Sequence, residues 1–205
     1  MRIVNKLNQW VQFLTVTVTA TALAVVALLA ARNGRLFLLN DTASMPEGLY
    51  VRVPLHTGSD RKFERGDTVG VCLTDAMTQP YVLLGQARGY LEHTWLSGCA
   101  LHGGGRAVPL IKYVVATPGD EVAIVSSAAA GSDTPRPGVY VNGSLVPNST
   151  PLGRDSLGRA LPPLNVHSRL PSGWFLVMSP DARSFDSRYF GPVPEEDLVA
   201  RLVRL

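Results

Sequence analysis

Residues 40–50 read Asn-Asp-Thr-Ala-Ser-Met-Pro-Glu-Gly-Leu-Tyr, and this stretch contains the residue around which the rest of the chain is organised. Ser44 is a candidate nucleophile, because Pro46 fixes a bend beside it and Gly48 permits a close backbone approach. A loop serine near Pro and Gly is also common in an ordinary turn, so both interpretations stay open here. Two later stretches change the balance: residues 111–120 (Ile-Lys-Tyr-Val-Val-Ala-Thr-Pro-Gly-Asp) and 184–191 (Ser-Phe-Asp-Ser-Arg-Tyr-Phe-Gly).

An uncharged apolar run precedes the serine. Residues 7–31 contain no charged side chain, and residues 11–31 are mostly Val, Leu, Ala and Thr. Because about 20 apolar residues cross a bilayer, residues 10–31 are predicted to be a transmembrane anchor, with residues 1–9 as a cytoplasmic tail that carries two positive charges. A cleaved signal peptide is the alternative. The run is longer than an ordinary signal-peptide core, which favours the anchor.

The composition limits the domain content and the function classes of the residues outside this apolar run. They suit one domain, or a core domain with an insertion. The net charge is only +3 in 205 residues, and the basic residues are scattered, so the chain lacks a nucleic-acid-binding pattern. The two cysteines, Cys72 and Cys99, are too few for a disulfide scaffold or a zinc pattern. They could pair if the domain lies outside the cytoplasm, or be two small buried side chains.

Short apolar runs broken by Gly, Pro, Asn and Asp follow from residue 36, which is typical of a mainly β fold. Residues 36–205 are therefore predicted to form one β-rich domain, with insertions near 75–108 and 126–138. Asn142-Gly143 predicts a tight hairpin within residues 139–146. The predicted strands are residues 48–53, 68–73, 110–116, 121–125 and 174–178. A short helix is expected at 81–91, loops at 103–105, 126–137 and 147–171, and a helix or strand at 194–205.

A serine nucleophile needs a base that takes its proton. The four histidines, His56, His93, His102 and His167, lie in polar, loop-like settings without a recognisable motif. Lys112 lies instead in an apolar strand, where burial would lower its pKa and so favour the neutral form that can act as a base. The alternative is that Lys112 extends its ammonium to solvent from an edge strand. Spacing alone leaves both open.

These features together resemble the membrane-anchored bacterial signal peptidase family, which uses a Ser/Lys dyad. The matching features, in order, are the apolar anchor, Ser-Met-Pro-x-Gly-Leu-Tyr from Ser44, Lys112 with Val-Val-Ala-Thr-Pro-Gly-Asp, and residues 184–193. The form of the serine motif is most similar to the TraF-type peptidases of conjugative transfer systems. The stretch at residues 179–183, Ser-Pro-Asp-Ala-Arg, departs from the Gly-Asp-Asn-Arg run of the general secretory enzyme.

The resemblance implies a role for each matching residue. Ser44 would attack the scissile carbonyl, and Lys112 would be the general base. The backbone N–H of Ser44 and the hydroxyl of Thr42 would bind the oxyanion. Ser184 would orient the lysine. Asp186 and Arg188 would form an ion pair that shapes the site. Such a mechanism needs neither a metal nor a cofactor.

The resulting hypothesis is a serine endopeptidase, anchored by a single span in the bacterial inner membrane with its catalytic domain outside the cytoplasm. Its partners would be the lipid bilayer and a membrane-inserted precursor, a conjugative pilin, whose processing includes cyclisation in some members of the TraF-type group. Two alternatives are kept. One is a general leader peptidase for exported proteins. The other is a non-catalytic, membrane-anchored scaffold of a transfer or secretion apparatus.

Overall fold

The computed structural model describes residues 2–33, 37–53, 63–73, 79–91, 99–100, 106–107, 109–126 and 135–205. The side chains of residues 2–9, 29–33, 79, 100, 106 and 107 are not part of this description. Three of the histidines, the loop expected at 103–105 and most of the loop expected at 126–137 therefore lie outside the described residues. The mainly β fold with one N-terminal apolar helix, predicted from the sequence, is confirmed.

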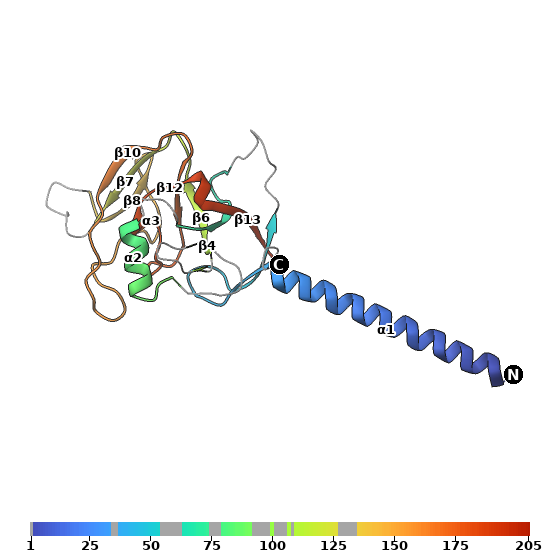
Figure 1. Ribbon diagram of the computed structural model, residues 1–205. Helices are drawn as coiled ribbons and strands as arrows, with labels where there is room; N and C mark the ends of the chain where they lie inside the picture. The colour runs from blue at the N-terminus through green and yellow to red at the C-terminus, as the bar shows by residue number, and fades with distance from the viewer. Residues whose placement is uncertain are drawn as a thin grey trace.

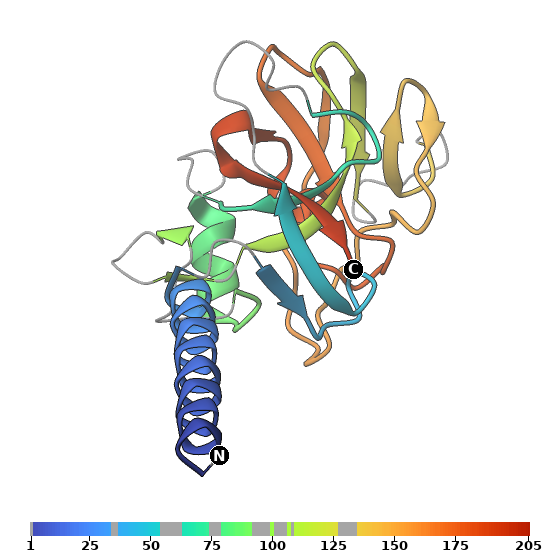
Figure 2. The ribbon, with the colours of Figure 1, turned by 90° about the vertical axis from the view of Figure 1, so that its right-hand side faces the viewer.

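The N-terminal helix α1, Arg2–Asn33, extends away from the β domain (Figures 1 and 2). Its segment Trp10–Leu28 has the length and composition of a membrane span, which also suit a signal sequence near an N-terminus. Apolar side chains on it, such as Phe13 and Leu23, are about two-thirds exposed. Threonine hydroxyls in the span donate to backbone carbonyls one turn earlier, as Thr15 does to Val11 at 2.7 Å. These polar groups therefore need no water.

Seven strands form the larger sheet, in the order β1-β2-β13-β3-β6-β11-β12. Neighbouring strands of this sheet pair antiparallel. The strands are β1 Phe37–Asn40, β2 Gly48–Val53, β3 Thr68–Val71, β6 Leu110–Ala116, β11 Trp174–Met178, β12 Val193–Pro194 and β13 Leu198–Arg204. β6 is interior, with β3 on one side and β11 on the other, so its side chains are more enclosed than those of an edge strand. This position is what buries Lys112.

A second sheet of four strands has the order β10-β7-β8-β9 and lies at the end of the domain far from α1 (Figures 1 and 2). Its strands are β7 Glu121–Val125, β8 Gly138–Val141, β9 Ser144–Leu145 and β10 Val166–Arg169. The predicted hairpin turn joins β8 to β9. Asn142 and Gly143 both have positive φ, 49° and 77°, the conformation that a two-residue hairpin loop of this type requires.

The short elements lie around the larger sheet. They are helix α2 Gln79–Ala87, strands β4 Cys99–Ala100 and β5 Arg106–Ala107, helix α3 Ser187–Phe190 and a 3-10 turn at Glu195–Asp197. Cys72 and Cys99 form a disulfide, with their Cα atoms 5.3 Å apart. The bond ties β4 to the end of β3, across a loop that includes α2.

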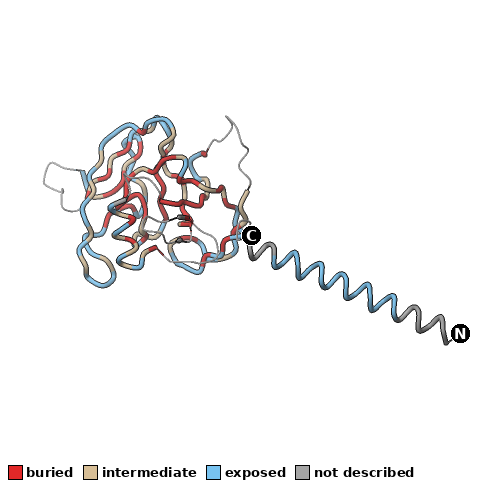
Figure 3. The backbone as a smooth tube through the Cα atoms, viewed as in Figure 1, coloured by how far each residue is buried: buried red, intermediate tan, exposed pale blue. Residues whose placement is uncertain are grey.

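The buried apolar side chains form three clusters, and the buried residues gather inside the β domain (Figure 3). The first lies around Val69, Val114 and Phe175. The second joins the four-stranded sheet to the larger one through Ile124 and Leu176. The third contains Leu38, Met45, Tyr50, Ile111, Ala200 and Leu202. The third cluster is the one that positions the candidate site.

Most strand predictions are confirmed, including 48–53, 110–116, 121–125 and 174–178. Two predictions are wrong in part. The loop expected at 147–171 contains β10, which the polar sequence Val-His-Ser-Arg concealed. The helix expected at 81–91 begins at Gln79 and ends at Ala87, because Gly89 takes a positive φ of 73° that ends helical geometry. At the C-terminus, where a helix or a strand was expected, β13 forms.

Candidate active site

The Ser44 loop joins β1 to β2, and the Met45 side chain holds this loop in the core. The Met45 side chain is 2% exposed and belongs to the same core cluster as Ile111. Ser44 directly precedes Met45, and Lys112 directly follows Ile111. Packing of the two apolar neighbours therefore places the serine loop beside β6, although residues 44 and 112 are far apart in the sequence.

Lys112 is buried, at 3% exposure, on the interior strand β6, where it lies opposite Val69 of β3. Burial lowers its pKa from the usual value to about 8, and the nearby carboxylate of Asp186 partly opposes this shift. Among the described residues, no hydrogen bond stabilises its ammonium; the influences on its pKa are burial and more distant charges. The prediction that Lys112 lies in a buried strand agrees with this position, and the edge-strand alternative does not.

A cavity of about 340 Å³ brings the predicted residues together. Ser44, Thr42, Lys112 and Ser184 all line it. Its other walls come from the start of the serine loop, the beginning of β6, the turn after α2 and the segment before α3: Leu39, Asn40, Asp41, Gly89, Tyr90, Pro109, Leu110, Ile111, Arg183 and Phe185. Four elements distant in sequence thus build one pocket, with a hydroxyl and a buried amine in its lining.

Asn40, to which the sequence motifs assign no role, organises the serine loop. Its side chain is buried at the end of β1. The amide nitrogen donates to the carbonyls of Thr42, Met45 and Pro46 at 3.0, 2.8 and 3.2 Å. The amide oxygen accepts the Thr42 hydroxyl at 2.8 Å, and that hydroxyl lies 3.0 Å from the Ser44 Oγ. The only sequence signal for this role is weak: an asparagine directly before a turn sequence.

The segment after β11 supplies the remaining predicted residues. β11 ends at Met178 opposite Tyr113, so the chain that follows begins beside Lys112. Ser184 lines the cavity, and its hydroxyl donates to the Ser179 Oγ at 3.0 Å. Among the described residues no hydrogen bond joins Ser184 to Lys112, so its expected orienting role stays a prediction.

Asp186 and Arg188 form a fully buried ion pair behind the pocket wall. The guanidinium donates to both carboxylate oxygens of Asp186 and to the carbonyls of Asn148, Ser179 and Asp181. Asp186 also accepts the backbone N–H groups of Ser179 and Arg188, which makes it the N-cap of α3. Neither residue lines the cavity. Their contacts are those of a group that fixes the shape of the turn holding Ser184.

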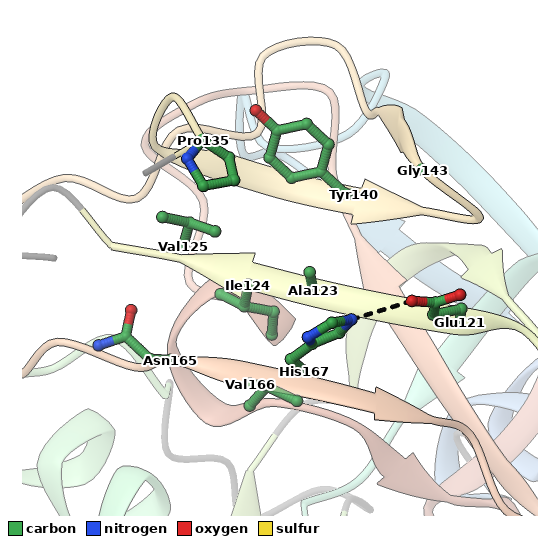
Figure 4. A pocket seen from close by; sticks show the side chains of 10 residues that line it. All are labelled: Glu121, Ala123, Ile124, Val125, Pro135, Tyr140, Gly143, Asn165, Val166 and His167. Atoms are coloured by element: carbon green, nitrogen blue, oxygen red, sulfur yellow. Dashed lines mark hydrogen bonds and ion pairs between the residues drawn. The ribbon is translucent and has the colours of Figure 1, made fainter. Parts of the chain in front are cut away.

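A second cavity, of about 650 Å³, lies on the four-stranded sheet (Figure 4). His167 of β10 points across this sheet to Glu121 of β7, with 2.9 Å between its Nε2 and the carboxylate. Of the four histidines His167 is the one that the structure describes, and it lines this cavity and not that of Ser44. His167 is therefore in the wrong place to be the base for Ser44.

Comparison with known proteins identifies the class to which this fold and pocket belong. The model of the family described as signal peptidase, peptidase S26, matches residues 7–205. The chain therefore belongs to the S26 signal peptidase family, as the resemblance of its motifs indicated.

Two relatives are about one-third identical to this chain over most of its length. A protein named conjugal transfer protein TraF from Agrobacterium fabrum is 33% identical over 165 residues, which cover 80% of this chain and 78% of that protein. A plasmid transfer protein TraF from Escherichia coli is 31% identical over 169 residues, covering 78% and 77%. A solved structure of a signal peptidase I from Enterococcus faecalis is 18% identical and covers 69% of this chain and 97% of its own, with a TM-score of 0.33.

Proposed function

We propose that this protein is a membrane-anchored serine endopeptidase in which Ser44 is the nucleophile and Lys112 the general base. One observation carries the proposal: Ser44 and Lys112 line the same cavity, and burial lowers the pKa of the lysine to about 8. A lysine at its ordinary pKa would be almost wholly protonated at neutral pH and could not accept a proton. With a pKa near 8, a useful fraction of Lys112 is neutral.

The proposed reaction begins when Ser44 Oγ attacks the carbonyl of the scissile peptide bond. The Ser44 hydroxyl proton passes to the neutral amine of Lys112. The tetrahedral intermediate then collapses, the C–N bond breaks, and the lysine returns its proton to the leaving amine. An acyl-enzyme on Ser44 remains. A second nucleophile, which is water or an amino group of the substrate, releases the acyl group with Lys112 again taking and returning a proton.

The negative oxygen of the intermediate needs hydrogen-bond donors. We assign this role to the backbone N–H of Ser44 and the hydroxyl of Thr42, which lies in the pocket lining 3.0 Å from the Ser44 Oγ. Loss of one such donor typically lowers kcat by about 10²–10³-fold. Asp186 and Arg188 are assigned to shaping the turn that carries Ser184.

The position of the domain supports a substrate that lies in the membrane. Residues 34–36 separate α1 from β1, so the β1 end of the sheet must lie close to the end of the apolar helix. This end carries exposed apolar side chains on one face. Strand register groups them across β1, β2 and the chain end at β13: Phe37, Leu39, Leu49, Val203 and Leu205. Such a patch suits contact with a bilayer surface, and confinement of enzyme and precursor to one plane raises the chance of encounter.

The compartment in the proposal is extracytoplasmic. The disulfide between Cys72 and Cys99 is of a kind that persists in oxidising compartments and is rare in the cytosol. The substrate class in the proposal is a pilin precursor, because the relatives at 31–33% identity are named as conjugal or plasmid transfer proteins. A coding sequence without transfer or secretion genes nearby would count against this choice of substrate.

The test is processing of a membrane-inserted pilin precursor by the full chain, purified in detergent. Wild type, Ser44→Ala, Lys112→Ala and the matched control Ser168→Ala, at an exposed position on β10, are compared by intact mass. We expect cleavage by wild type and control and none by the two site variants. The product mass separates hydrolysis from cyclisation by one water. Cleavage by Ser44→Ala would remove the nucleophile from the proposal.

Two further results would favour one of the alternative functions over the proposed one. Rescue of a strain depleted of its own leader peptidase would favour the general leader peptidase. Normal transfer by a host that carries Ser44→Ala would favour a scaffold without catalysis.

A further inference from the structure

The amide group of Asn40 has a defined orientation in the structure. Three backbone carbonyls, of Thr42, Met45 and Pro46, lie 2.8–3.2 Å from one atom of the amide. Carbonyl oxygens only accept, so that atom must be the nitrogen, and its two N–H groups are shared among the three carbonyls. The amide oxygen is therefore the atom that faces Thr42. No other orientation satisfies the buried groups.

This orientation fixes the direction of the next two hydrogen bonds. The Asn40 oxygen can only accept, so the Thr42 hydroxyl proton points to it across 2.8 Å. The Thr42 oxygen is then left as an acceptor, and the Ser44 hydroxyl, 3.0 Å away, must be the donor between them. In this resting arrangement Ser44 is held by a directed chain that begins at a buried amide.

We infer that Asn40 is a positioning residue for the Ser44 nucleophile. It acts in two ways that rest on separate contacts. Through three carbonyls it holds residues 42–46 in one loop conformation. Through Thr42 it sets the rotation of the Ser44 hydroxyl. Ser44 becomes free to attack when its hydroxyl proton turns from Thr42 to Lys112. Thr42 becomes free to bind the oxyanion when its own hydroxyl proton turns away from Asn40. This inference rests on the proposed function for its catalytic half.

The size of the expected effect follows from the sensitivity of catalysis to geometry. A displacement of about 1 Å at the reacting atoms costs about 10²-fold in rate. Asn40→Ala removes every contact of the amide, so kcat is expected to fall about 100-fold. KM is expected to change less than about threefold, because β6, the turn after α2 and the segment before α3 still supply most of the cavity wall. Asn40→Asp is expected to be at least as damaging, because it puts an oxygen opposite three carbonyl oxygens.

The experiment combines steady-state kinetics on the precursor with hydrogen–deuterium exchange of the full chain in detergent. Asn165→Ala is the control. The Asn165 side chain accepts a hydrogen bond from the backbone N–H of Ser126 at 3.1 Å, and it lines the cavity on the four-stranded sheet and not that of Ser44. We expect both Asn40 variants to lose kcat with KM kept and to exchange faster at residues 41–47. We expect the control to keep the kcat of wild type and its exchange at 41–47.

The outcomes separate the two levels of the inference. Wild-type kcat in Asn40→Ala or Asn40→Asp would overturn it, as would an equal loss in the control. Unchanged exchange at residues 41–47 in Asn40→Ala would overturn the loop-holding half. If wild type processes no precursor while Asn40→Ala still loosens residues 41–47, the proposed function fails and the loop-holding half stands.

Discussion

Two buried cationic groups lie near the pocket, and they differ in how they are stabilised. The Arg188 guanidinium is wholly buried, with Asp186 and three carbonyls as partners. Lys112 is buried to nearly the same extent, yet none of the described residues accepts a hydrogen bond from its ammonium, and its pKa falls to about 8. The Arg188 charge is permanent and structural. The Lys112 charge can be lost.

The difference shows what burial does to a charge. A buried ion keeps its charge only when hydrogen bonds and an opposite charge replace the lost water. Arg188 has both, whereas Lys112 has only the more distant fields of Asp186 and Asp181, which raise its pKa without cancelling the effect of burial. Burial therefore leaves Arg188 charged, in a structural role, and makes Lys112 easier to deprotonate, as a base requires.

Lys112→Met should separate activity from stability, and it has the largest expected effect. The change keeps the volume and removes the amine. Processing should fall by at least about 10⁴-fold, as for loss of a catalytic base. The free energy of unfolding should stay the same or rise, by up to about 4 kcal/mol, because an unpaired buried charge is gone. Kinetics and thermal unfolding in detergent measure the two. A strongly destabilised Lys112→Met would show that the lysine is structural.

The Asp186–Arg188 pair should behave in the opposite way. Arg188→Met leaves a buried carboxylate without its guanidinium and is expected to cost about 3–5 kcal/mol of unfolding free energy. The double variant Asp186→Leu/Arg188→Met removes both charges and should lose less than Arg188→Met alone. Thermal unfolding of the three proteins checks this. A double variant less stable than the single one would mean that the turn depends on the carboxylate's backbone contacts more than on charge pairing.

The pH dependence sharpens the comparison further. Since the base must be neutral, kcat/KM should rise about tenfold per pH unit below 8 and level off above it. Because Asp186 raises the pKa of Lys112 and Arg188 lowers it, Asp186→Asn should move the midpoint below 8, and Arg188→Met should move it above. Shifts in the same direction would mean that structural change outweighs charge.

Stability gives an independent readout of the same lysine. The folded-state pKa of about 8 lies below the usual 10.5, so between these two values the unfolded chain binds more protons. The free energy of unfolding contributed by Lys112 should therefore increase as pH rises from about 8 to 10.5 and be at its lowest below pH 8. Lys112→Met should remove this increase. If the free energy of unfolding rises with pH as steeply in Lys112→Met as in wild type, the rise comes from other groups.

The sequence predicted those parts of the molecule that local pattern determines. Residues 110–116 are apolar enough to indicate a strand, and one lysine within them indicated an unusual environment. β10 was missed because it pairs on one side only, with β7, and three of its four residues are exposed, so it has little apolar pattern to detect.

The pocket itself was not readable from pattern alone. The sequence brought Ser44 and Lys112 together through a family resemblance. In the fold the serine loop lies beside β6 because Met45 and Ile111 share a core cluster, and Ser44 and Lys112 line one cavity. Asn40 was missed for a similar reason. Its hydrogen bonds to Thr42, Met45 and Pro46 depend on how the loop closes over it, and in sequence it is only an asparagine before a turn.

Gly85→Ala in α2 tests whether the pocket wall and the ion pair are mechanically linked, with the smallest expected effect. A Cβ at Gly85 would lie 2.9 Å from Leu91 Cγ and 3.1 Å from Phe185 Cε1, and Phe185 lies between Ser184 and Asp186. Overpacking costs about 1–3 kcal/mol, and alanine returns about 1 kcal/mol of helix propensity. The net loss should therefore be about 0–2 kcal/mol, measured by thermal unfolding.

Activity should respond more than stability to this change. The Asp186–Arg188 turn is held by many hydrogen bonds, so the displaced Phe185 ring should move toward the cavity that it lines. We expect a fall in kcat/KM with an unchanged pH midpoint, because the charges around Lys112 stay in place. Leu83→Ala, at an exposed position of the same helix, is the control and should leave kcat/KM as in wild type. A shifted pH midpoint in Gly85→Ala would show instead that the strain reaches the ion pair.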